Sequence, residues 1–158
     1  MTKNDLTSVI QELGANLGIA DLEMGSDGQA ALTVGPLEMA LIPATGDPEV
    51  LWIMAKLGDL GDDPEAPAFL LQANFFAWHG FTMTVALEET NDDGFEVIAF
   101  TAVPMTMVAA ASLTQTFTTF AEAALALHGR LVSHDYSPLD PTTLQDAPPP
   151  HMGAMLHV

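Results

Sequence analysis

The sequence predicts an α+β fold in which helices pack on a twisted antiparallel sheet. Segments with strand-like composition form one group of three and one group of two. Single stretches with helical spacing of apolar residues separate and flank these groups. The predicted order is therefore helix, three strands, helix, two strands, helix. Successive strands interrupted by single helices are typical of α+β domains with an antiparallel sheet.

The first half of the chain supplies one helix and the group of three strands. Residues 5–17 place apolar side chains at helical spacing, and Gly18 is a suitable stop. A turn signal at residues 25–29 precedes the first strand. The three strands are predicted at residues 30–34, 37–42 and 50–57.

The second half contains two helices on either side of a β-hairpin. An acidic loop at residues 58–67 ends in prolines that are well placed in the first turn of a helix. The hairpin turns at residues 89–94, and Pro104 ends its second strand. These elements are predicted at residues 68–79 (helix), 82–88 and 95–103 (strands) and about 107–131 (helix).

The chain is long enough for one domain, predicted at residues 1–132. Residues 133–158 contain five of the eleven prolines and show neither helical nor strand periodicity. We therefore expect a proline-rich, poorly ordered tail after the last helix.

The helix predicted at residues 68–79 has two apolar faces instead of one. At about 100° per residue, one face can cover the sheet, while the second needs another partner. In a single domain of this size we expect a second copy of the chain, and hence a homodimer. A helix sandwiched within one monomer is the alternative. The two faces comprise Phe69, Leu70, Ala73, Phe76 and Ala77, and Leu71, Phe75 and Trp78, respectively.

Two of the predicted strands are apolar on both alternations. In residues 50–57, Trp52 and Met54 point to one face while Leu51 and Ile53 point to the other. An antiparallel sheet with one solvated face normally alternates more cleanly between apolar and polar residues. Surplus apolar surface of this kind usually marks an interaction site.

The charge of the chain excludes some partners. The chain has 21 acidic and three basic residues and a formal net charge of −18. Such a surface repels phosphate groups, so we expect neither nucleic-acid binding nor binding to anionic membranes. Cysteine is absent, the first residues lack a secretory signal pattern, and no apolar run reaches membrane-spanning length. The sequence therefore predicts a soluble, cytoplasmic protein without membrane insertion.

No catalytic motif is present in the sequence. It contains no glycine-rich phosphate loop and no serine nucleophile elbow, and a thiol nucleophile is excluded. The best interpretation of His79 and His128 is capping at helix ends. A metal site formed by His151 and His157 is a weaker alternative use of histidine. We therefore expect no enzymatic activity, no metal and no cofactor.

The chain resembles a known family over roughly residues 5–132. The motif "FLLQANFFAWHGFTMTVALEE", followed by "FEVIAFTAVPM", is similar to the class I type III secretion chaperones, the Tir-chaperone family. Members typically carry a segment with two leucines, an asparagine and a following aromatic residue. Here these are Leu70, Leu71, Asn74 and Phe75.

The resemblance implies a cytoplasmic homodimer that binds the N-terminal segment of a secreted effector in extended form and keeps it competent for secretion. By this resemblance, the dimer interface comprises Leu71, Phe75, Trp78 and Met83. The implied effector-binding residues are Leu6, Ile10, Leu13, Leu32, Val34, Met39 and Leu41. The alternative is a small α+β ligand-binding domain or metabolic enzyme unrelated to secretion, for which a buried pocket with convergent polar groups would be expected.

Overall fold

The structure confirms the predicted order of helices and strands. It is a computed structural model that describes residues 3–19, 21–44, 50–74, 83–91, 94–137 and 156–157. A short 3₁₀ helix, η1, and a two-residue strand, β6, add to the predicted elements. The elements are α1 (Lys3–Leu17), β1 (Ala30–Val34), β2 (Leu37–Pro43), β3 (Val50–Asp59), α2 (Ala66–Ala73), β4 (Thr84–Glu89), β5 (Phe95–Pro104), η1 (Met105–Met107), α3 (Ala110–Val132) and β6 (Leu156–His157).

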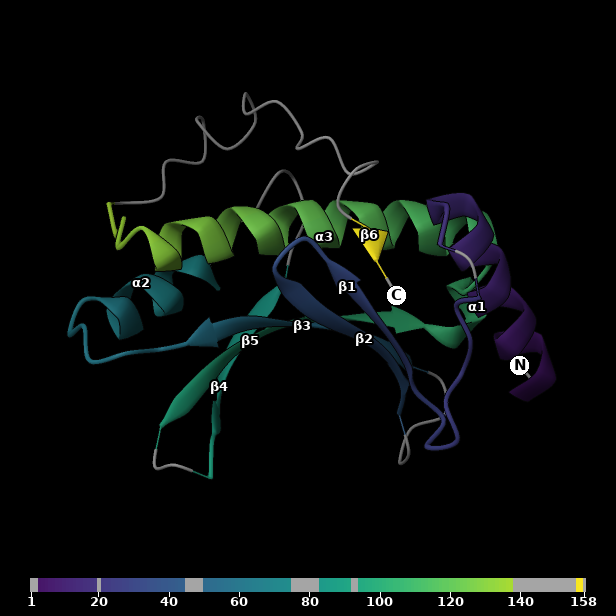
Figure 1. The fold of residues 1–158 in the computed structure, drawn as a ribbon, viewed down its shortest axis with the longest axis horizontal. Helices are drawn as coiled ribbons and strands as arrows, with labels where there is room; N and C mark the ends of the chain where they lie inside the picture. Colours follow the sequence, from purple (N-terminus) through teal and green to yellow (C-terminus); the bar gives the residue numbers. More distant parts are fainter. Residues whose placement is uncertain are drawn as a thin grey trace.

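The strands form one antiparallel sheet in the order β4-β5-β3-β2-β1-β6. The helix α3 lies across this sheet, with α1 at one end of α3 and α2 near the other (Figure 1). One row of cross-strand partners, Met39, Ala55, Ala99 and Val85, runs through β2, β3, β5 and β4. All four side chains are buried, so they mark the face of the sheet that supports the core. We call this the inner face.

The core forms between the inner face and α3. The apolar stripe of α3 is fully buried at Leu113, Phe117, Phe120, Ala124 and Leu127, which confirms the predicted spacing. Burying a Leu or Phe side chain stabilises the fold by about 1.5–3 kcal/mol relative to leaving it exposed. This stripe therefore supplies a large share of the stability and fixes which face of the sheet is inner.

A β-bulge in β3 anchors α3 to the sheet. The register with β5 shifts between Lys56 and Gly58, and Gly58 adopts a φ of 105° that favours glycine. The Nδ1 of His128 lies 2.8 Å from the carbonyl oxygen of Leu57, within the bulge. Since a carbonyl only accepts, Nδ1 must carry the proton. The capping interpretation of His128 is therefore wrong, because the ring bonds to a strand and not to the end of its own helix. His79 lies outside the described residues.

The Asn74 side chain forms hydrogen bonds with the free edge of β4, on the side away from β5. The backbone N–H of Val85 donates to Asn74 Oδ1 at 2.6 Å, and Asn74 Nδ2 donates to the Val85 carbonyl at 3.1 Å. The primary amide thus pairs with the strand much as another backbone would. Because unpaired edge groups invite pairing with other chains, this contact protects the β4 edge.

The chain folds back on the domain directly after α3. Arg130 lies over the Phe69 ring, with its Cζ 4.8 Å from the ring centroid, and bonds to the carbonyl of Ser137. Tyr136 packs against the same ring, with centroids 5.5 Å apart. Farther along, Leu156 and His157 pair with β1. Residues 138–155 lie outside the described part, where the expected disorder of the tail stays a prediction.

We predict that Asn74→Asp lowers the free energy of unfolding by about 1–3 kcal/mol, because a carboxylate cannot donate to the Val85 carbonyl. Gln72→Glu is the matched control, since it makes the same change at an exposed position of α2. Urea denaturation of both variants measures the effect. Equal losses in the two variants would contradict the role of the amide at the strand edge.

The contact of Tyr136 with the domain predicts a shifted titration. Burial raises the pKa of Tyr136 above 10.0, and the charges of Asp63 and Glu65 raise it further. The folded state therefore favours the neutral phenol. This contribution to stability is present below the unfolded pKa and is lost as pH rises through the folded pKa. Tyr136 is the only tyrosine, so phenolate absorbance reports it alone. Asp63→Asn should lower its pKa, whereas Asp27→Asn should leave it unchanged.

Candidate functional site

The candidate site is the face of the sheet opposite α3, which we call the outer face. Its side chains come from the second alternation of each strand, and in the strands β1, β2 and β3 they are half-buried or exposed where those of the inner face are buried. The rings of Trp52 and Phe100 meet edge to face, with centroids 5.5 Å apart. The outer face is therefore apolar and ordered, yet it retains accessible surface. Its apolar side chains include Ala40, Ile42, Trp52, Met54, Ile98 and Phe100.

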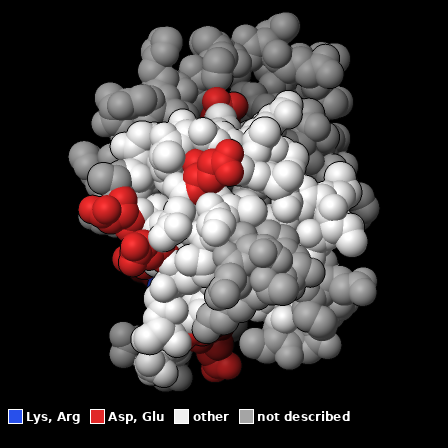
Figure 2. Space-filling view, turned by 90° about the vertical axis from the view of Figure 1, so that its right-hand side faces the viewer, with Lys and Arg blue, Asp and Glu red and all other residues white. Residues whose placement is uncertain are grey.

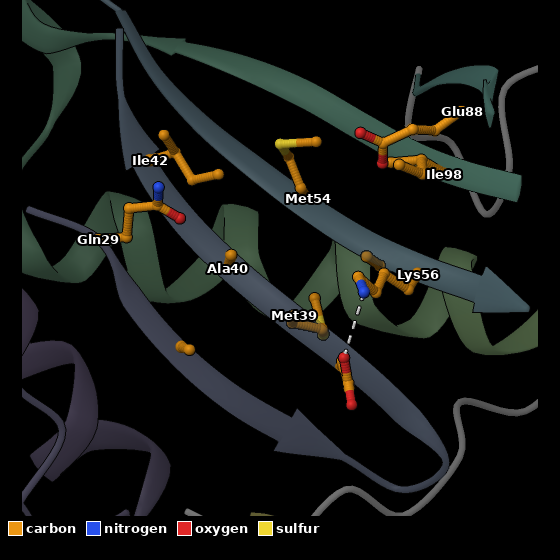
Figure 3. A pocket seen from close by; sticks show the side chains of 11 residues that line it. Gln29, Met39, Ala40, Ile42, Met54, Lys56, Glu88 and Ile98 are labelled. Carbon is orange, nitrogen blue, oxygen red and sulfur yellow. Dashed lines mark ion pairs between the residues drawn. The ribbon is translucent and has the colours of Figure 1, made fainter. Parts of the chain in front are cut away.

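A shallow hollow of about 370 Å³ lies in the outer face. Ile42, Met54 and Ile98 approach it from three neighbouring strands (Figure 3). Ala31 and Ala40 also line it, and their small side chains leave room between the larger ones. The hollow is thus suited to the side chains of an extended segment laid across the strands.

Charged side chains border the hollow. Lys56 Nζ lies 3.5 Å from a carboxylate oxygen of Glu38, the ion pair drawn in Figure 3. It also lies 3.5 Å from a carboxylate oxygen of Glu96, so Lys56 links β3 to both neighbouring strands. The charges of Glu96 and Glu38 raise the pKa of Lys56, so the amine stays protonated. Glu88 also lines the hollow, and none of the ion pairs among the described residues includes it. The border is therefore acidic overall.

A second apolar surface lies between α2 and β4. A hollow of about 300 Å³ is lined there mainly by apolar side chains, including Pro67 and Leu70. Leu71 projects from α2 with 65% of its surface exposed. Leu87 and Phe95 of the neighbouring hairpin are 43% and 47% exposed. We call these three residues the α2 surface.

The predicted effector-binding residues all lie in the core. Each is at most 5% exposed, so they present almost no free surface in this conformation, although Met39 is among the residues that line the hollow of the outer face (Figure 3). Their contact with an effector stays a prediction. The spacing of these residues predicts one apolar face of a helix or strand, but it does not decide whether that face is core or binding surface. The seven residues are Leu6, Ile10, Leu13, Leu32, Val34, Met39 and Leu41.

The predicted dimer residues are placed only in part. Leu71 is exposed on the α2 surface, while Met83 is buried with 2% exposure. Phe75 and Trp78 lie outside the described residues. The structure thus gives one of the four residues the accessibility that an interface needs, and the assignment of all four stays a prediction.

The described residues were also compared with the requirements of a metal site and of a membrane-spanning helix. They contain no group of three or more potential metal ligands. None of the described helices is long and apolar enough to cross a membrane. On the face shown in Figure 2, acidic side chains are spread over a largely uncharged surface.

A comparison with models of known protein families identifies the family to which this chain belongs. Residues 8–128 match the model of the Tir chaperone protein (CesT) family, which is most of the chain. The chain belongs to the Tir chaperone (CesT) family. This confirms the resemblance carried by the leucine pair and Asn74, and membership in a chaperone family points to a binding role instead of a catalytic one.

A solved structure supports the fold of this family member. The crystal structure of the ExsC-ExsE complex contains a chain that is similar with a TM-score of 0.66 and 14% identity. The match covers 82% of this chain and 95% of the other. At this identity the likeness shows the fold alone. A comparison with curated protein sequences finds no match for this Tir-family chain.

Proposed function

We propose that this protein is a type III secretion chaperone that binds the N-terminal segment of a secreted effector in extended form. The observation that carries the proposal is the outer face, an apolar and hollowed sheet surface in a member of a chaperone family. The similar fold in the complex of ExsC with ExsE is consistent with a binding role.

The energetics call for a contact larger than the hollow itself. Association costs about 4–15 kcal/mol and ordering a disordered segment about 2–5 kcal/mol more. At about 25 cal/mol per Å² of apolar surface, these costs require on the order of 240–800 Å² of buried apolar area. The effector segment therefore extends across several strands of the outer face. We propose contacts with Ala31, Ala40, Ile42, Trp52, Met54 and Phe100, the accessible apolar residues of these strands.

The acidic border favours an effector segment that carries basic residues. Glu38, Glu88 and the net charge of −18 attract such a segment and accelerate its capture. Salt screens this contribution beyond a distance of about 10 Å at 0.1 M, whereas apolar contacts persist. Binding should therefore slow with salt and lose only part of its affinity.

We further propose that the chain forms a homodimer through the α2 surface. Leu71, Leu87 and Phe95 are exposed apolar side chains, and Leu71 precedes Phe75 and Trp78 in the sequence. Apolar surface of this kind marks an interaction site. Self-association through α2 would leave the outer face available to the effector.

The alternative function, a small ligand-binding domain or metabolic enzyme, requires a pocket with convergent polar groups. In the part of the chain that the structure describes, no polar or charged side chain is buried. Both hollows described above are open and mainly apolar. No described feature favours this alternative.

Effector binding by the outer face can be tested by introducing one charged side chain into its hollow. We predict that Met54→Glu weakens effector binding at least about tenfold, because the hollow would then place a carboxylate against apolar side chains of the effector. The probe is the N-terminal segment of an effector identified by co-purification and mass spectrometry. Calorimetry should also show a negative heat-capacity change for the native protein.

Met107→Glu is the matched control for this test, because Met107 is 64% exposed and lines neither hollow. Circular dichroism verifies that both variants remain folded. The outer face is not the binding surface if both variants bind the segment as the native protein does.

The dimer can be tested in the same way. We predict that Leu71→Asp shifts the mass in sedimentation from twice 16.7 kDa towards 16.7 kDa. Val132→Asp is the matched control, since Val132 has the same exposed fraction of 65% at the end of α3. A native protein that sediments as a monomer at micromolar concentration would refute the proposed homodimer.

A further inference from the structure

The two edges of the sheet differ in how they are protected. At the β4 edge, the Asn74 amide occupies the backbone groups of Val85, and Glu88 and Glu89 add charge to the strand. Charges on an edge strand oppose pairing with another chain. The described residues of β1 are all uncharged, so they offer no charged side chain that would oppose pairing at the β1 edge. Strand addition is therefore favoured at β1.

The described residues of β6 cover the β1 edge over only part of its length. β6 pairs antiparallel with β1 at two positions, His157 with Thr33 and Leu156 with Val34. Within the described sheet, no strand pairs with residues 30–32 on the edge of β1 that points away from β2. A two-residue pairing is short compared with the usual strand of about 5–6 residues. Such a strand is easily displaced.

We infer that the edge of β1 is a strand-accepting site that the chain's own residues Leu156 and His157 occupy until a strand of a partner replaces them. The inference rests on the proposed function only for the identity of the replacing strand, an extended effector segment. Backbone pairing at an exposed edge is a common way to bind such segments.

The length of the chain permits this occupancy. Eighteen residues, 138–155, connect Ser137 to Leu156 and can span up to about 60 Å when extended. The 23 residues of α3 measure about 35 Å, so the connection can return from the end of α3 to β1. A flexible tether can give an effective concentration of about millimolar, which lets a weak pairing compete with a partner.

The open part of the edge adjoins the hollow of the outer face. On the side away from β2, Ala31 has no strand partner among the described residues, and it also lines the hollow. A partner strand can thus pair first with residues 30–32 and then displace β6 from Thr33 and Val34. Alternate side chains of that strand would point over the outer face. The partner is therefore an extended segment with apolar side chains at alternate positions.

Hydrogen exchange tests the inference on the full-length chain. The double substitution Leu156→Pro and His157→Pro removes two backbone donors from β6. The matched control places the same two prolines at Thr142 and Thr143. We expect amide exchange in β1 to accelerate about three- to tenfold in the first variant and to stay unchanged in the control. Amides of the central strand β5 should stay unchanged in both variants.

The synthetic peptide of residues 151–158, HMGAMLHV, serves as the strand probe. In the variant, the peptide should restore protection of the β1 amides by binding to the vacant edge. In the native chain it must first displace β6, so binding there should require a peptide concentration about three- to tenfold higher. Unchanged exchange in β1, or equal peptide concentrations for both chains, would overturn the inference. Neither result affects the proposed function, which fails instead if no effector segment binds the native protein in calorimetry.

Discussion

The packing of α3 on one face of the sheet determines what the rest of the molecule can do. Phe117 and Phe120 are fully buried against the inner face, and α1 and α2 pack near opposite ends of the same helix (Figure 1). The apolar alternation that faces α3 becomes core. The other alternation, which includes Trp52 and Met54, remains half-buried on the outer face. A fold with one covering layer thus produces both its stability and its candidate binding surface.

An open antiparallel sheet also has two edges, and the chain treats them differently. Asn74 binds both backbone groups of Val85 and permanently satisfies one position of β4. The β1 edge is covered by β6, a strand from the end of a long connection. A side chain held by its helix is difficult to displace, whereas a tethered two-residue strand is not. Closure at one edge and exchange at the other would direct strand addition to the side nearest the hollow.

Local periodicity predicts the elements of this fold, but long-range contacts decide the site. The stripe of α3 and the order of the strands follow from spacing, and the structure confirms both. The face of each strand does not follow from spacing, because Leu51 and Trp52 are equally suited to a core. The effector-binding residues implied by the resemblance, such as Met39 and Leu41, are buried, because their side chains lie on the alternation of β2 that faces the core. The partner of Asn74, eleven residues away, and the contact of His128 with Leu57 could not be derived from local patterns.

If the proposed function holds, the outer face has to bind apolar segments without binding copies of itself indiscriminately. Its alanines limit the area that each strand exposes, and Met54 offers a flexible side chain that adapts to different partners. Lys56 lies between Glu38 and Glu96 and offsets part of their negative charge at the border of the hollow. The remaining acidic charge opposes the approach of another acidic copy while it attracts a basic segment. Under the proposed function, the combination of a shallow apolar surface with an acidic border would give selectivity for an extended basic partner, and neither feature alone would provide it.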